Sequence, residues 1–302
     1  MAEAMEQFLA QRAWLVGLAY RLLGSAADAE DVVQDAFVRW NRVDHAVIAS
    51  PSAWLAKVVT NLCLNRLASA RLQREVYAGP WLPEPVLTAD GGLGPLDSVA
   101  QRESVSMALL LLLERLTPTE RAVFVLHEAF AYGYREIAGI VELSESNCRQ
   151  LNRRARQRVG QRQPRFRPDT SHWQRLVERF LAAAREGDLR ALELLLAADV
   201  VTWADGGGKI TAARRPVTGR TKVARYIAGG IGRLGTDVEA LPAEINGQPG
   251  LVGLCEGVVV GVIVLEMQDD LIGSLRIVAN PGKLRFIALQ LAMSHSAALA
   301  GS

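Results

Sequence analysis

The chain has 302 residues, of which 50% are hydrophobic and 22% charged, and its formal net charge at pH 7 is +2. This composition excludes a disordered chain, and the length allows two or three domains that each bury a core. The small net charge says little about partners, because arginine is concentrated at 149–167. The sequence has neither a signal-peptide pattern nor an apolar stretch of about 18 residues, so we expect a cytoplasmic protein.

The three cysteines, Cys63, Cys148 and Cys255, are far apart, and each lies in an apolar context. None belongs to a CxxC motif or has a histidine nearby, so their spacing fits neither a zinc site nor a redox pair. We predict buried thiols, no metal and no cofactor.

Residues 5–75 are predicted to form a first helical domain. Ser25 can cap the helix that follows it, whose apolar residues lie on one side. Asp28, Asp31 and Asp35 recur at steps of three and four on another side. Acids in the first turn stabilise the helix dipole, but Asp35 lies beyond that turn, so this face could also bind a basic partner.

A long helix at 52–74 completes this domain. Its outward side carries amides and cations, with a tryptophan near its start, and consists of Trp54, Lys57, Asn61, Asn65, Arg66, Arg71 and Arg74. Such a face suits unpaired nucleic acid, because aromatic rings stack on bases and cations hold phosphates. An ordinary solvated helix surface is the alternative.

Residues 76–100 are predicted to be a linker, because GPWLPEP at 79–85 and the glycines that follow prevent long regular structure. The segment Trp81, Leu82 and Pro83 is either part of a stiff connector or an apolar element that docks in a groove of another domain. We favour docking, since an exposed Trp-Leu pair would be poorly placed in water.

Residues 101–163 are predicted to form a helix-turn-helix domain. One helix is expected from 98 to 116, at the end of the linker and the start of this domain. Thr117 and Glu120 have the spacing of a capping box, and Ser144 can start the last helix. The outward side of that last helix carries Ser146, Arg149, Gln150, Arg153, Arg154 and Arg156. Such a helix can enter a DNA major groove, whereas a solvated basic helix or one that binds an acidic partner is the alternative.

The last third of the chain begins with a short linker at 164–171. Residues 172–285 then change from helical to strand periodicity, with two helices, a strand, a helix and four more strands. This pattern predicts an α+β cone with an antiparallel sheet. Residues 286–302 form a carboxyl-terminal tail.

Three sequence blocks, in their order, resemble the extracytoplasmic-function sigma factors of bacterial RNA polymerase, which belong to the sigma-70 family. The blocks are AEDVVQDAFVRW at 29–40, SAWLAKVVTNLCLNRL at 52–67 and the helix-turn-helix stretch that begins LTPTERAVF at Leu116. The resemblance covers about residues 5–160. It implies two all-α domains, the second a helix-turn-helix, and two partners, core RNA polymerase and promoter DNA.

The resemblance also implies a role for each predicted face. The polymerase clamp would be bound by Asp28, Asp31, Gln34 and Asp35. The helix from Trp54 to Arg74 would capture the −10 promoter element as a single strand, and the face from Ser146 to Arg156 would read the −35 element as duplex.

Residues 172–285 resemble the SnoaL-like domains of the nuclear transport factor 2-like fold. Sigma factors with this extension share three motifs with the chain: WLPEP in the linker, DGGGK at 205–209 and NPGKL at 280–284, where Gly282 replaces the usual Asp. In that group the extension regulates the sigma domains in cis. The residues implied in interdomain contacts are Trp81, Leu82, Pro83, Asp205, Gly206, Gly207, Gly208, Lys209, Asn280, Pro281 and Lys283.

Two other roles are open for this last domain. Fused to a helix-turn-helix regulator, it could be a cyclase or isomerase, with His172, Asp205, Tyr226 and Asp237 as candidate groups for proton transfer. It could also be a sensor that binds a small apolar ligand. No pairing among the four candidates follows from the sequence, so we predict no catalytic residue and no enzyme.

Overall fold

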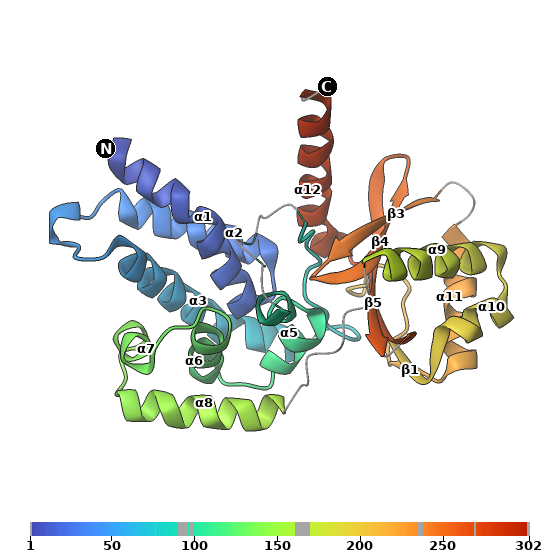
Figure 1. The fold of residues 1–302 in the computed structure, drawn as a ribbon, viewed down its shortest axis with the longest axis horizontal. Helices are drawn as coiled ribbons and strands as arrows, with labels where there is room; N and C mark the ends of the chain where they lie inside the picture. The colour runs from blue at the N-terminus through green and yellow to red at the C-terminus, as the bar shows by residue number, and fades with distance from the viewer. Residues whose placement is uncertain are drawn as a thin grey trace. The chain divides into compact units, whose positions relative to one another are not determined.

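The computed structural model describes residues 2–75, 77–89, 93, 96, 99–160, 170–234, 238–268 and 270–300. The chain divides into two compact units, coloured along the sequence in Figure 1. The first unit contains residues 1–76 and 90–164, and the second contains 77–89 and 165–302. The expected linker is therefore divided, and its WLPEP segment belongs to the second unit.

The first unit is helical. Its elements are α1 (Ala2–Leu23), α2 (Ala26–Trp40), the 3-10 helix η1 (His45–Val47), α3 (Pro51–Glu75), α4 (Val99–Glu103), α5 (Met107–Leu113), α6 (Pro118–Glu128), α7 (Tyr134–Val141) and α8 (Glu145–Val159). The predicted caps are confirmed: Ser25 accepts a hydrogen bond from the Asp28 N–H, and Thr117 and Glu120 form the capping box of α6. These starts are local, because a side chain satisfies a backbone N–H only three residues away.

The single helix expected at 98–116 is wrong. The chain forms α4 and α5 there, and the Ser106 side chain accepts a hydrogen bond from the Leu109 N–H at the start of α5. Because a capping serine adopts an extended backbone conformation, it interrupts the helix that precedes it.

The helices of the first unit share one core. Helix α3 contacts α6 and α7, and α1 contacts α6. Two buried arginines join α1 and α6 to the segment that contains α4 and α5. Arg21 Nε donates to Ser104 Oγ at 2.7 Å, and an Arg121 nitrogen lies 2.5 Å from Glu114 Oε1. Burial lowers the pKa of Arg121 to about 9, because its charged form loses water contacts.

The second unit is built on a six-stranded sheet with the order β2-β1-β6-β5-β4-β3. Its strands are β1 (Leu196–Asp205), β2 (Val217–Thr218), β3 (Val238–Ile245), β4 (Gln248–Cys255), β5 (Val258–Gln268) and β6 (Leu271–Val278). The expected antiparallel sheet is wrong at one pairing, because β1 and β6 run parallel. The helix and the four strands between them carry the chain back so that β6 enters beside β1 in the same direction.

Helices cover this sheet. Helices α9 (Thr170–Glu186), α10 (Leu189–Leu195) and α11 (Arg220–Leu234) pack on one face, and α12 (Pro281–Ala300) contacts β5 (Figure 1). Phe180, Leu192, Ile227 and Leu275 are buried in the core between α9 to α11 and the sheet. The residues expected as a tail continue α12 as far as Ala300. The predicted fold class, helical domains followed by an α+β domain, is confirmed.

Candidate nucleic-acid interface and linker site

Helix α8 presents the predicted duplex-binding face to solvent. Ser144 caps the helix, and Cys148, Ala155 and Val159 lie in its buried stripe. The exposed side carries every predicted residue: Ser146, Arg149, Gln150, Arg153, Arg154 and Arg156. Sequence periodicity did not single out Asn152, which is buried and donates hydrogen bonds to Glu128 and to the Tyr134 hydroxyl.

Two of these arginines are held in place and two are not. Arg149 pairs with Glu145, and its guanidinium lies 5.5 Å from the centre of the Tyr134 ring. An Arg156 nitrogen lies 2.7 Å from a Glu128 oxygen. Among the described residues, Arg153 and Arg154 form no ion pair. The face therefore combines arginines held by neighbouring side chains with exposed arginines that form no ion pair among the described residues, which suits contact with bases and phosphates.

The acidic face of α2 touches a cation predicted to bind DNA. Asp31, Gln34 and Asp35 are exposed, and Asp28 is partly exposed. Arg66 on α3 lies 2.7 Å from Asp28 and 3.3 Å from Asp31. The sequence did not predict this contact, because it joins helices 35 or more positions apart.

The predicted single-strand face of α3 is only partly open. The Trp54 ring centre lies 5.5 Å from that of Trp40, and Lys57 Nζ lies 2.9 Å from Glu142 at the end of α7. Asn61 is half-buried and Asn65 is exposed. The side chains of two further predicted members, Arg71 and Arg74, lie outside the described residues.

In the second unit, the linker is held by a group of five residues that we call the Asp205 cluster: Tyr77, Leu82, Asp205, Asn280 and Lys283. The buried Asp205 carboxylate accepts hydrogen bonds from the Tyr77 hydroxyl at 2.5 Å and from the Leu82 N–H at 2.9 Å. Lys283 Nζ donates to Asp205 at 2.7 Å and also to the Leu82 carbonyl. Asn280 Nδ2 donates to the Tyr77 hydroxyl at 2.7 Å.

The protonation of Tyr77 and the charge of Lys283 both favour binding of the linker. Burial raises the pKa of Tyr77, and its hydrogen bond to Asp205 raises it further, so the hydroxyl stays protonated and donates. Lys283 Nζ lies 4.3 Å from the centre of the Trp81 ring, a cation–π distance. Pro83 is buried, whereas Pro281 is exposed at the start of α12.

Glycine is required in the loop that follows Asp205. A side chain on Gly206 would place Cβ 2.2 Å from the Ile210 carbonyl oxygen. At Gly207, where φ is +61°, Cβ would lie 2.2 Å from Asn280 Nδ2. Gly208 also has a positive φ, and Lys209, the last residue of the motif, is exposed outside the cluster. Close approach and left-handed backbone therefore explain this run of glycines.

The rest of the linker pairs with two residues that the sequence analysis missed. Asn246, which is buried with a φ of +54°, exchanges hydrogen bonds with the Val86 backbone. Gln290 on α12 bonds to both the N–H and the carbonyl of Leu87, at 2.9 and 3.1 Å. An Asn-Gly pair between two strands indicates a tight turn but says nothing of a third segment bound to it.

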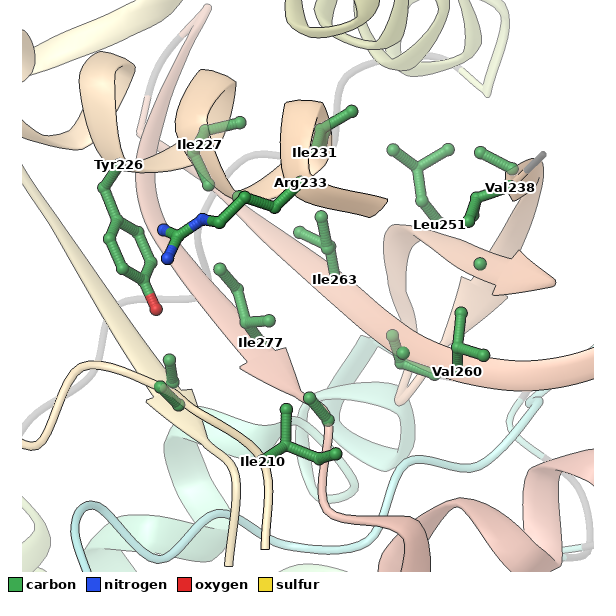
Figure 2. A pocket seen from close by; sticks show the side chains of 18 of the residues that line it. Ile210, Tyr226, Ile227, Ile231, Arg233, Val238, Leu251, Val260, Ile263 and Ile277 are labelled. Carbon is green, nitrogen blue, oxygen red and sulfur yellow. The ribbon is translucent and has the colours of Figure 1, made fainter. Parts of the chain in front are cut away.

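The second unit also contains a large apolar cavity of about 1300 Å³. Ile227 and Ile231 of α11 lie on one side of it, and Leu251, Ile263 and Ile277 of the sheet lie on the other (Figure 2).

Comparison with known proteins decides the family. Residues 8–73 match the model of sigma-70 region 2, and residues 106–159 match that of sigma-70 region 4. Over 292 residues the chain is 39% identical to the ECF RNA polymerase sigma factor SigJ of Mycobacterium tuberculosis, covering 92% of each chain. This chain is an extracytoplasmic-function sigma factor.

Other similarities agree. The sigma factor is 32% identical over 281 residues to the probable ECF RNA polymerase sigma factor SigI of M. tuberculosis, covering 91% of this chain and 92% of the other. It superposes on the crystal structure of M. tuberculosis SigJ with a TM-score of 0.73 and 36% identity, covering 93% and 98% of the two chains. The predicted family is confirmed. The protein is an alternative sigma factor that directs core RNA polymerase to promoters.

Of the four residues considered for catalysis, the two whose side chains the structure describes, Asp205 and Tyr226, have different hydrogen-bond partners. Asp205 is used by the linker, and Tyr226 lines the cavity, where its hydroxyl accepts a hydrogen bond from the Ala213 N–H at 3.3 Å. The side chain of His172 and the whole of Asp237 lie outside the described residues. In the part of the chain that is described, no helix is long and apolar enough to cross a membrane.

Proposed function

We propose that the second unit regulates the sigma factor in cis by holding the linker at 77–89. The observation that carries this proposal is the Asp205 cluster, in which a buried carboxylate binds a linker hydroxyl and a linker amide. Burial of Leu82, Val86 and Leu87 adds hydrophobic stabilisation. The linker is therefore held by specific polar contacts and by apolar area together.

The length of the linker limits how far apart the helices on its two sides can lie. The −10 and −35 elements are centred about 25 base pairs apart, or about 85 Å along duplex DNA. Fully extended, residues 77–98 span about 75 Å, whereas 90–98 alone span about 30 Å. While 77–89 stays bound it cannot extend, so less of the linker is available to let the helices on its two sides separate toward the two elements. Release of the linker therefore favours promoter binding.

Three faces would act once the helices separate. The acidic face of α2 would bind core polymerase, and the α3 face would hold the −10 element as a single strand. The exposed arginines of α8 would read the −35 duplex, with Arg149 and Arg153 on base edges and others on phosphates. The pair Lys57–Glu142 supports a closed free state, because it joins the DNA-binding face of α3 to the end of α7 on the other side of the linker. Since core polymerase is the partner, the sigma factor would work in the cytoplasm.

In vitro transcription with core polymerase tests the regulation. Leu82→Asp would set a second carboxylate beside Asp205 and repel the linker while leaving the sheet domain unchanged. We expect several-fold more promoter-specific transcript than from the unaltered chain. Ala89→Asp is the matched control, because Ala89 is exposed at the end of the same segment. Equal output from all three chains would reject regulation by linker capture.

We also propose that the second unit is a sensor and not an enzyme. The apolar cavity supports binding of a small apolar molecule. Catalysis has less support, because Asp205 is committed to the linker and Tyr226 accepts a backbone hydrogen bond.

A further inference from the structure

Four glycines line the cavity without a packing reason. Gly230 and Gly232 lie inside α11, and a Cβ added at either would meet no atom within 4 Å. Gly253 and Gly261 face each other across β4 and β5, and there the nearest atoms to an added Cβ are 3.6 and 3.7 Å away. Glycine destabilises helix and strand interiors by roughly 0.5–1 kcal/mol relative to alanine.

These glycines therefore keep space open. None has the positive φ that would require glycine, and none is crowded by backbone. Gly253 and Gly261 lie beside an irregularity in the pairing of β4 and β5, and glycines within strands mark either such a bulge or the close approach of a ligand. The four glycines lie on two opposite sides of one cavity, α11 and the sheet, which indicates that the cavity accommodates a ligand.

The charged side chains at the cavity indicate what fills it. Arg185, Lys209, Arg233 and Glu239 line it, which gives three cations against one carboxylate, and all four are exposed. Within the ranges that the structure describes, none of the three cations has an ion-pair partner. An added Cβ at Gly282 would lie 3.9 Å from Lys209 Nζ, so glycine at this position leaves Lys209 without a neighbouring carboxylate.

We propose that the cavity binds an anionic amphiphile, a molecule with a long apolar body and one acidic head group. The apolar body would lie between Ile231 of α11 and Ile263 of the sheet, and the head group would pair with Arg185 and Arg233. Figure 2 shows the Arg233 guanidinium and the Tyr226 ring both extending from α11. Apart from the charged side chains, Thr211 and Tyr226 bring hydroxyl groups to the apolar wall.

The same site is connected to the linker. Lys209 and Ile210 line the cavity and directly follow the loop that begins at Asp205. The negative charge of a head group at Arg185 and Arg233 would also attract Lys209, and so act on the loop that binds Tyr77 and Leu82. The inference thus rests on the proposed sensor role and names its ligand class.

Isothermal titration calorimetry of the full chain with laurate tests the site, without polymerase or DNA. We expect saturable binding of one laurate per chain. Gly230→Leu, which fills the cavity, should weaken it by roughly tenfold or more. Gly229→Leu is the matched control, because Gly229 is the neighbouring helix position, has open space around it and does not line the cavity. Absence of binding, or equal binding by both variants, would overturn the proposal.

The charge of the ligand is tested with probes of equal length. Laurate should bind more tightly than dodecanol and dodecyltrimethylammonium, and Arg185→Gln with Arg233→Gln should weaken laurate roughly tenfold without affecting dodecanol. Tighter binding of dodecanol would overturn the anionic class and leave the sensor role standing. Because no transcription is measured, neither result depends on the regulation by linker capture.

Discussion

Lys283 Nζ lies 2.7 Å from Asp205 Oδ2, with the two side chains 10% and 0% exposed. Both charges belong to the sheet domain, and both also bond to the linker at Leu82. The ion pair is therefore part of the site that binds the linker. A change that disturbs the pair must also disturb the hold on the linker.

The first prediction concerns the stability of this pair. Asp205→Asn leaves Lys283 charged and buried without its partner, which should lower the free energy of unfolding by about 3–5 kcal/mol. Adding Lys283→Met removes the unpaired charge and should restore part of that loss. Asp199→Asn, an exposed change on the same strand, should cost less than about 0.5 kcal/mol. Calorimetric unfolding measures all four chains, and equal stability of Asp205→Asn and Asp199→Asn would contradict the prediction.

The second prediction concerns the −35 face. Arg149→Ala and Arg153→Ala should each cost about 1–3 kcal/mol on the cognate duplex and relax specificity at one position. Arg135→Ala, on the exposed surface of α7, should leave binding unchanged. Fluorescence anisotropy with cognate and scrambled duplexes distinguishes the roles. Equal loss on both duplexes would mean that these arginines contact phosphates.

The third prediction concerns polymerase binding. Asp31→Lys with Asp35→Lys reverses two charges on the exposed face of α2 and should abolish capture of core polymerase in a pull-down. Binding to an isolated −35 duplex should remain, because α8 is not altered. Glu6→Lys, at an exposed position of α1, serves as the control. Full capture of polymerase by the double variant would refute this role of the face.

The fourth prediction concerns the contact between α3 and α7. Lys57 holds the pKa of Glu142 below its usual range, through a hydrogen bond and the attraction between their charges. Glu142→Lys replaces this attraction with repulsion, so α3 should become more accessible and bind a −10 single-stranded oligonucleotide more tightly. Because the pair depends on an ionised carboxylate, the wild-type contact should persist above the unfolded pKa of Glu142 and weaken as pH falls through the lowered folded value. Identical oligonucleotide affinities for Glu142→Lys and the exposed α9 change Glu186→Lys would contradict this.

Features set by short-range patterns could be predicted from the sequence. The Thr117 capping box and the exposed side of α8 follow from spacings of three and four residues, and the structure has both. Contacts across long separations could not be predicted from periodicity. Arg66 meets Asp28 across 38 positions, and Gln290 meets Leu87 across 203, so only the folded topology brings them together. The parallel pairing of β1 and β6 was missed for the same reason.

The most direct test of linker capture is hydrogen–deuterium exchange at the amides of 77–89, in the free chain and in a complete promoter complex with core polymerase. The Leu82, Val86 and Leu87 amides are hydrogen-bonded within the second unit, so they should exchange slowly in the free chain. In the promoter complex their exchange should become much faster. Equal protection of these amides in both states, in a complex that still transcribes, would contradict the account.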